Sequence, residues 1–102
     1  FKYIIFKFTH NFNIAYFMNR KNRIESILLN NFKKWKIEVI DNSADHAGHN
    51  NFDGSNETHF KLILKNNYYN IQDRLEIHKT INLLLKKEFS SGLHALEIKI
   101  SN

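Results

Sequence analysis

The residues of this chain that could do chemistry are its six histidines, because the 102-residue sequence contains no cysteine. Without cysteine, the chain alone can form no disulfide, no thiolate nucleophile and no all-cysteine metal site. Neutral imidazole remains a good metal ligand. His46 and His49 form an H-x-x-H pair, a spacing that can hold zinc. Two histidines without a third ligand make only a weak site.

The other four histidines have more ordinary interpretations when the residues are considered alone. His94 is expected to open the last strand on its apolar side, as a hydrogen-bonded histidine at the edge of the core. His59 is expected on the outer face of a strand, in a structural or interface role, and His78 on a helix, as a packing or surface residue. His10 lies in a leading segment and supports no inference.

No catalytic constellation accompanies these histidines. The serines lack a nucleophile-elbow context, and the sequence contains neither a glycine-rich phosphate loop nor an HExxH helix. Four carboxylates lie in or beside one polar loop, where solvated side chains are much commoner than an acid–base pair; they are Asp41, Asp45, Asp53 and Glu57. We therefore expect a protein that is not an enzyme.

The basic character of the chain is confined to its first part. Residues 1–24 contain five basic residues and no acidic residue, whereas residues 25–102 contain ten of each, so the whole formal charge of +5 comes from the leading segment. A nucleic-acid-binding body normally carries its own basic patch. The charge distribution therefore makes nucleic acid the less favoured partner.

We expect residues 1–19 to be an N-terminal extension and residues 20–102 to be the folded domain. Lys2 and Lys7 interrupt the apolar run of the extension, so the run is too short to span a membrane, and no membrane partner is expected. The extension fits a transit-peptide remnant as well as an extra strand or an ordered tail. Its basic, acid-free composition favours a mitochondrial location over a cytoplasmic or plastid one.

Hydrophobic spacing predicts the elements that must position the histidines. Apolar residues at helical spacing predict a helix over about 21–32, and Trp35, Ile37 and Val39 then alternate with polar residues as in a half-buried strand. Residues 42–57 form a long polar loop. A second strand follows, in which Phe60 and its alternate neighbours face the core and His59 faces outward.

The second half of the chain predicts a helix and a last strand. Asp73 followed by Glu76 is a capping-box pattern, and Gly92 is expected to end the helix. The expected inner face of this four-turn helix consists of Leu75, His78, Ile81, Leu85 and Phe89. Residues 94–100 then alternate as a third strand. The prediction is an α+β fold: a single αββαβ domain with a mixed three-stranded sheet and its helices on one face.

Four segments of the sequence, taken together, resemble the BolA family. They are DNSADHAGH at 41–49, GSNETHFK at 54–61, IHK at 77–79 and LHALEIK at 93–99. The family shows a D/N-x-S-x-x-H loop, a G-S-x-T-H-F-like strand entry, an R-H-R/K helix motif and a V-H-A-L strand, and the resemblance runs from Met18 to Ile100. The chain departs from the pattern at Ile77, where arginine is usual, at Ile71, where glycine is usual, and in a loop that is one or two residues longer.

The resemblance implies a type II KH-like fold and an adaptor role in iron–sulfur cluster maturation or trafficking. A monothiol glutaredoxin would be the partner, and the two proteins would share a [2Fe-2S] cluster. Glutaredoxin and glutathione would supply thiolates, while this chain would supply His94 and His46, with His49 as a substitute for His46 if the loop register differs. No cofactor is expected in the isolated protein, which would be a monomer or a weak homodimer.

The resemblance also implies an alternative, a nucleic-acid-binding transcriptional regulator with a KH-like fold. Against this alternative, the sequence contains no G-x-x-G backbone clamp of the KH kind.

Overall fold

The order of helices and strands follows the αββαβ prediction. The computed structural model describes residues 18–46 and 57–102, so the expectations for residues 1–17 lie outside the described residues. The elements are α2 (Arg20–Asn31), β1 (Lys36–Asp41), the 3-10 helix η1 (Ser43–His46), β2 (His59–Lys65), the 3-10 helix η2 (Ile71–Asp73), α3 (Arg74–Leu84), α4 (Lys86–Ser90) and β3 (Ala95–Ser101). None of the helices in the described ranges is long and apolar enough to cross a membrane.

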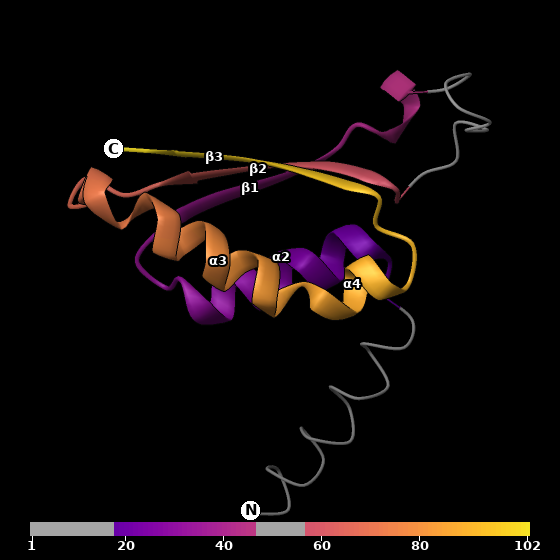
Figure 1. Cartoon of the computed structure of the whole chain (residues 1–102), viewed down its shortest axis with the longest axis horizontal. Coiled ribbons are helices and arrows are strands. Elements are labelled where there is room, and N and C mark those ends of the chain that lie inside the picture. Colours follow the sequence, from indigo (N-terminus) through magenta and orange to yellow (C-terminus); the bar gives the residue numbers. More distant parts are fainter. Residues whose placement is uncertain (1–17, 47–56) are drawn as a thin grey trace, which may run out of the picture.

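The three strands form one mixed sheet in the order β1-β2-β3. β1 pairs with β2 in the antiparallel direction, and β2 pairs with β3 in the parallel direction. The register aligns Val39, Leu62 and Ile98 across the three strands. Figure 1 shows α2, α3 and α4 on the same face of this sheet. The predicted mixed sheet with helices on one face is therefore confirmed.

The core lies between the sheet and the helices, where the apolar periodicity predicts it. Phe60, Leu62 and Leu64 alternate along β2 and are at most 1% exposed. Ile24, Leu28, Val39, Ile81, Leu85 and Leu93 complete the buried cluster. The alternation in β2 and the helical spacing in α2 each place one apolar face toward the same interior, so the two elements are held together by hydrophobic burial.

The predicted four-turn helix differs from the structure in its continuity and in its start. Leu85 separates α3 from α4, so the single helix is in fact two. Asp73 makes no side-chain capping hydrogen bond, and its backbone (φ −87°, ψ 0°) is not in the extended conformation of an ordinary N-cap. Asn70 is extended instead, and its side chain accepts a hydrogen bond from the backbone N–H of Gln72.

The inner face of the predicted helix is also partly wrong. Leu75 is 63% exposed and Phe89 is 37% exposed, whereas Ile81 and Leu85 are fully buried as predicted. Glu88, only 6% exposed, takes the buried position that the prediction gave to Phe89. The apolar pattern could not identify Glu88, because its burial depends on a charged partner on another helix.

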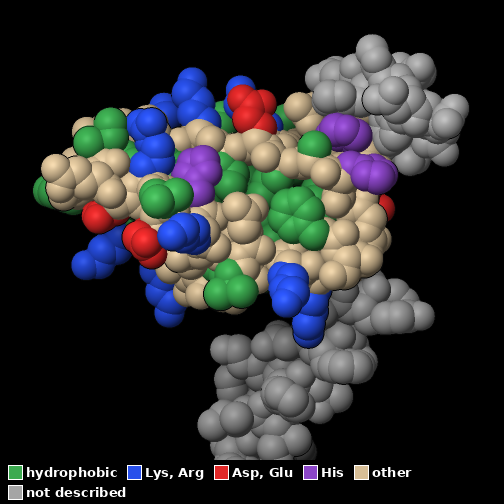
Figure 2. All heavy atoms as spheres, viewed as in Figure 1, with side chains coloured by type: hydrophobic (Ala, Val, Ile, Leu, Met, Phe, Trp, Pro, Cys, Tyr) green, Lys and Arg blue, Asp and Glu red, His purple; other side chains and the backbone are tan. Residues whose placement is uncertain are grey.

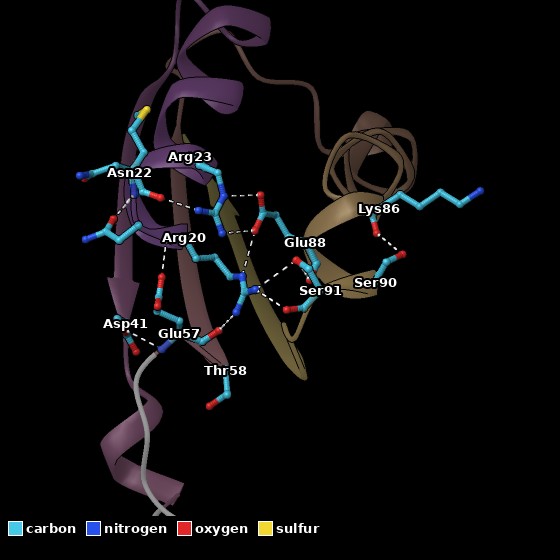
Figure 3. A network of polar contacts seen from close by, with 12 residues as sticks. Arg20, Asn22, Arg23, Asp41, Glu57, Thr58, Lys86, Glu88, Ser90 and Ser91 are labelled. Atoms are coloured by element: carbon cyan, nitrogen blue, oxygen red, sulfur yellow. Dashed lines mark hydrogen bonds and ion pairs between the residues drawn. The ribbon is translucent and has the colours of Figure 1, made fainter. Parts of the chain in front are cut away.

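Glu88 binds two arginines, Arg20 and Arg23, at the beginning of α2. Arg20 Nε donates to Glu88 Oε1 at 2.9 Å, and Arg23 donates to both carboxylate oxygens of Glu88, through Nε at 2.9 Å and Nη2 at 3.0 Å. Figure 3 shows Arg20 between Glu88, Ser91 and the backbone at Glu57. Its Nη2 donates to the carbonyl of Ser91 at 2.7 Å, and its Nη1 donates to the carbonyl of Glu57. The Arg20 side chain, which is 9% exposed, thereby has a hydrogen-bond acceptor for each of its three nitrogens.

Gly92 lies beside this guanidinium in a conformation that favours glycine. It has a φ of +127°, in the region that favours glycine, as expected for the residue that follows the helix. A Cβ at this position would lie 3.3 Å from both Nη1 and Nη2 of Arg20. A side chain at this position would therefore be strained by the backbone conformation and would press against the Arg20 guanidinium.

Replacing Glu88 with Gln should destabilise the fold by about 3 kcal/mol at pH 7, because the buried Arg20 loses its counter-ion. Urea unfolding measures this difference. The control is Glu97→Gln, whose side chain is 64% exposed and 4.0 Å from Lys61, and which should change stability by less than about 1 kcal/mol.

The effect of Glu88→Gln should also depend on pH. Burial raises the pKa of Glu88, but hydrogen bonds from Arg23 and Arg20 outweigh burial and hold this pKa below its ordinary value of 4.5. The stabilisation is therefore complete above pH 4.5 and is lost as the pH falls through the folded-state pKa. The gap in unfolding free energy between wild type and Glu88→Gln should narrow in acid. A gap that stays constant in acid would contradict this assignment.

Candidate functional site

His94 lies directly before β3, at the end of the sheet where β2 and β3 begin. Its backbone N–H donates to the carbonyl of Thr58 at 2.8 Å, and the N–H of Ala95 donates to the same carbonyl at 3.2 Å. His94 was expected within the strand on its apolar side, but β3 begins one residue later and the His94 side chain is exposed. Leu93, which is 3% exposed, is the last core residue before it. The backbone of His94 is thus fixed while its ring faces solvent.

His59 is the histidine that the structure places beside His94. It begins β2, and its ring centroid lies 6.1 Å from that of His94, with the two ring planes inclined by 38°. Figure 2 shows histidine side chains next to each other on the surface at one end of the molecule. The His59 side chain is half-buried, and its Nδ1 lies 2.9 Å from Thr58 Oγ1. Sequence reasoning expected only a structural or interface role for His59.

The proximity of His59 and His94 can be inferred from the sequence only when the pairing of β2 with β3 is known. His59 is in register with Ala95 across the parallel β2–β3 ladder. A histidine at the first position of β2 and another just before β3 must then lie at the same end of the sheet, because parallel strands begin at the same edge.

The segment that carries His46 reaches the same end of the sheet. His46 is the last residue of η1, which begins two positions after the last residue of β1. The N–H of Asn42 donates to the carbonyl of His59 at 3.0 Å, so the beginning of this segment is tied to the beginning of β2. The side chain of His46 and all of His49 lie outside the described residues, so their expected roles as ligands stay predictions.

Asp41 and Ser43 close the base of the 42–57 loop. The carboxylate of Asp41 accepts hydrogen bonds from Ser43 N at 3.0 Å, from Ser43 Oγ at 2.6 Å and from Glu57 N at 3.1 Å. Burial raises the pKa of Asp41, but these hydrogen bonds outweigh it and the pKa lies below its ordinary value of 3.8. The two ends of the loop are therefore held together by an ionised carboxylate.

Ser43 connects this carboxylate to the histidine end of β2. It is fully buried, and its Oγ accepts from the backbone N–H groups of Thr58 at 3.0 Å and His59 at 3.1 Å. Glu57, which precedes them, has a φ of +76°, unusual for a residue other than glycine. Its carboxylate accepts from the N–H of Arg20, so the charged network at α2 and the loop base meet at Glu57.

The described residues alone supply too few ligands for a metal ion. In residues 18–46 and 57–102, no group of three or more histidine, aspartate and glutamate side chains could hold one. His78 does not join the pair, since it lies on α3 and lines a groove with Ile98 and Lys99, farther along β3. Any metal or cluster at His94 must therefore take further ligands from another molecule or from the rest of the loop.

Replacing Ser43 with Ala should destabilise the fold by about 2–3 kcal/mol, because the buried N–H groups of Thr58 and His59 lose their acceptor. Urea unfolding measures the loss, and hydrogen exchange should show faster exchange at these two amides. The control is Ser26→Ala on the exposed face of α2, which should change stability by less than about 0.5 kcal/mol. Unchanged protection of both amides in Ser43→Ala would contradict the role given to Ser43.

Comparison with known proteins agrees with this architecture. The family model for "BolA-like protein" matches residues 28–102. The chain is 37% identical to the UV-induced protein uvi31 of Schizosaccharomyces pombe, over 82% of this chain and 85% of that protein. It is 32% identical to the DNA-binding transcriptional regulator BolA of Escherichia coli (strain K12), over 76% of this chain and 70% of that protein. The solved structure of the BolA domain of SufE1 from Arabidopsis thaliana is similar with a TM-score of 0.68 and 34% identity, over 82% of this chain and 92% of that one. Its sequence and its fold together show that this chain belongs to the BolA-like family.

Proposed function

We propose that this protein is a non-enzymatic adaptor in iron–sulfur cluster maturation or trafficking. It would bind a monothiol glutaredoxin and share a [2Fe-2S] cluster with it through histidine. The observation that carries the proposal is the exposed imidazole of His94, which precedes β3 on a backbone fixed by the Thr58 carbonyl. A ligand that a second protein must reach needs both this exposure and this fixed position.

The chemistry of the chain suits a shared cluster better than one held by the chain alone. Because the sequence contains no cysteine, every thiolate would have to come from glutaredoxin and glutathione. Imidazole is a good borderline ligand for iron. Histidine in place of cysteine on one iron also raises the reduction potential of a cluster, as in Rieske centres. A cluster held partly by imidazole, which protonation releases, would also leave more easily than one held by four thiolates.

His46 is the proposed second ligand from this chain. Its segment begins at the loop base closed by Asp41 and Ser43, and this base is tied to the same end of β2 that supports His94. A ligand on such a loop could complete the site when the partner arrives. His49 is the substitute for His46, because the two histidines are only three positions apart.

Adding the full chain to a glutaredoxin that carries a [2Fe-2S] cluster should change the visible absorption and circular dichroism spectra, because imidazole replaces a ligand. His94→Ala should abolish this change, and His46→Ala should reduce it. His78→Ala is the matched control, since this histidine lines a groove on α3 and should give the wild-type spectrum. Identical spectra for wild type and His94→Ala would remove the proposal.

The second candidate function is nucleic-acid binding, which the name of the Escherichia coli relative favours. Residues 25–102 carry equal numbers of acidic and basic residues, so we expect only weak duplex binding that salt removes easily. Fluorescence anisotropy with labelled DNA duplexes, at low and moderate salt, measures this. Tight, sequence-selective binding at moderate salt would instead favour the regulator.

A further inference from the structure

We propose that this chain binds a free nucleoside diphosphate in a pocket at the end of the sheet where β1 begins and β2 and β3 end. The pocket has a volume of about 450 Å³, within the range of roughly 300–1,000 Å³ that small-molecule sites occupy. Its lining includes three lysines and three residues of the turn after β2: Lys34, Lys36, Lys65, Asn66, Asn67 and Tyr68. We call it the lysine pocket. Because β3 is seven residues long, the lysine pocket lies about 20 Å from His94, and the inference does not rest on the adaptor role.

Two lysines of the pocket lie directly opposite each other. Lys36 and Lys65 are register partners across the antiparallel β1–β2 pair, and both side chains are exposed. Like charges in opposed positions destabilise a sheet, because their Cβ atoms are only about 4.5–5.5 Å apart. In the part of the chain that the structure describes, no ion pair involves either of them or Lys34. Glu38, the nearest acidic residue along β1, is in register with Ile63 instead. An anion in the pocket would offset this repulsion.

The segments around the lysine pocket are held together by aromatic packing. The rings of Trp35 and Tyr69 have centroids 5.5 Å apart, and Trp35 also meets the ring of Phe32 edge-on at 6.1 Å. These contacts hold the turn between α2 and β1 against the turn after β2. The N–H of Asn66 donates to the carbonyl of Ser101 at 3.1 Å, which ties the second turn to the end of β3. Figure 1 shows both turns at the end of the sheet that carries the C-terminus. The binding groups are therefore positioned before a ligand arrives, which lowers the entropic cost of binding.

The turn after β2 adds an uncharged donor and an aromatic ring. Asn66 Oδ1 accepts from the N–H of Tyr68 at 2.9 Å, so the NH₂ group of this amide remains to donate to a phosphate oxygen. The side chain of Tyr68 is 94% exposed, whereas aromatic side chains normally contribute to packing. An exposed ring beside cationic groups offers a face on which a base can stack.

The chemistry of these groups indicates the class of ligand. Lysine binds phosphate as a point charge, and three ammonium groups match the charge of a diphosphate better than that of a monophosphate. The ring of Tyr68 has a use only when the ligand also carries a planar group such as a base. A pocket of this volume suits one nucleotide, whereas sites for single strands contact several nucleotides in a row. A free nucleoside diphosphate therefore fits the charge, the ring and the size together.

NMR titration of the full chain with ADP, in buffer without magnesium, tests the site. The backbone amides of Lys36, Lys65 and Tyr68 should shift on addition of ADP, and that of His94 should not. Lys36→Gln and Lys65→Gln should each weaken ADP binding at least fivefold. The control is Lys86→Gln, which removes the same charge from an exposed position on α4 and should bind ADP as wild type does.

Tyr68→Ala separates the contribution of the base from that of the phosphates. It should weaken ADP binding at least fivefold and leave the binding of pyrophosphate unchanged, whereas Lys65→Gln should weaken both. Urea unfolding separates lost binding from lost folding. Lys65→Gln should have a urea midpoint no lower than that of wild type, because the substitution removes a repulsion from the sheet.

Four outcomes would overturn the inference. They are the absence of any shift with millimolar ADP, wild-type ADP affinity in both Lys36→Gln and Lys65→Gln, an equal loss of affinity in Lys86→Gln, and wild-type ADP affinity in Tyr68→Ala. A single-stranded oligonucleotide that binds at least tenfold more tightly than ADP would also overturn it, because a strand would then be the ligand.

The cluster experiment keeps this inference separate from the adaptor role. Lys65→Gln should lose ADP binding and retain the spectral change with cluster-loaded glutaredoxin, whereas His94→Ala should do the reverse. ADP binding without any cluster response removes only the adaptor role. A cluster response without ADP binding removes only the nucleotide site.

Discussion

The buried guanidinium of Arg20 is the constraint on which the rest of the structure depends. A charge inside the protein is tolerated only when it is paired and its donors are satisfied. Arg20 meets this condition by drawing together three segments that are distant in the sequence: Glu88 of α4 with Ser91 just after it, Glu57 before β2, and its own helix. The positions of these segments are therefore fixed by the directions of the hydrogen bonds from Arg20 as well as by the burial of apolar side chains.

The end of the sheet where His59 and His94 lie is held in position by the hydrogen bonds of Arg20. Glu57 touches Arg20 on one side and the Asp41 carboxylate on the other. The next residue, Thr58, offers its carbonyl to His94 and lies against the ring of His59. This end of the sheet therefore has an anchor in addition to the hydrophobic core. Here the anchor is electrostatic.

The sequence predicts the fold well because the fold depends on apolar periodicity. The alternation around Phe60 and Leu62 and the helical spacing of Ile24 and Leu28 identified the central strand, the first helix and their part of the core. Glu88 was missed because a periodic apolar pattern contains no information about a buried ion pair. The pairing of His59 with His94 was missed for a different reason, since it requires the parallel register of β2 and β3, which local patterns do not encode.

The closed base of the 42–57 loop affects how easily this loop can change in length during evolution. Asp41, Ser43 and Glu57 fasten the two ends of this loop to each other beside the beginning of β2. Inserting residues into a loop whose ends are already fixed costs little, on the order of 0.6 kcal/mol for each doubling of length. The length and the sequence of this loop can therefore change during evolution at little cost to the stability of the fold.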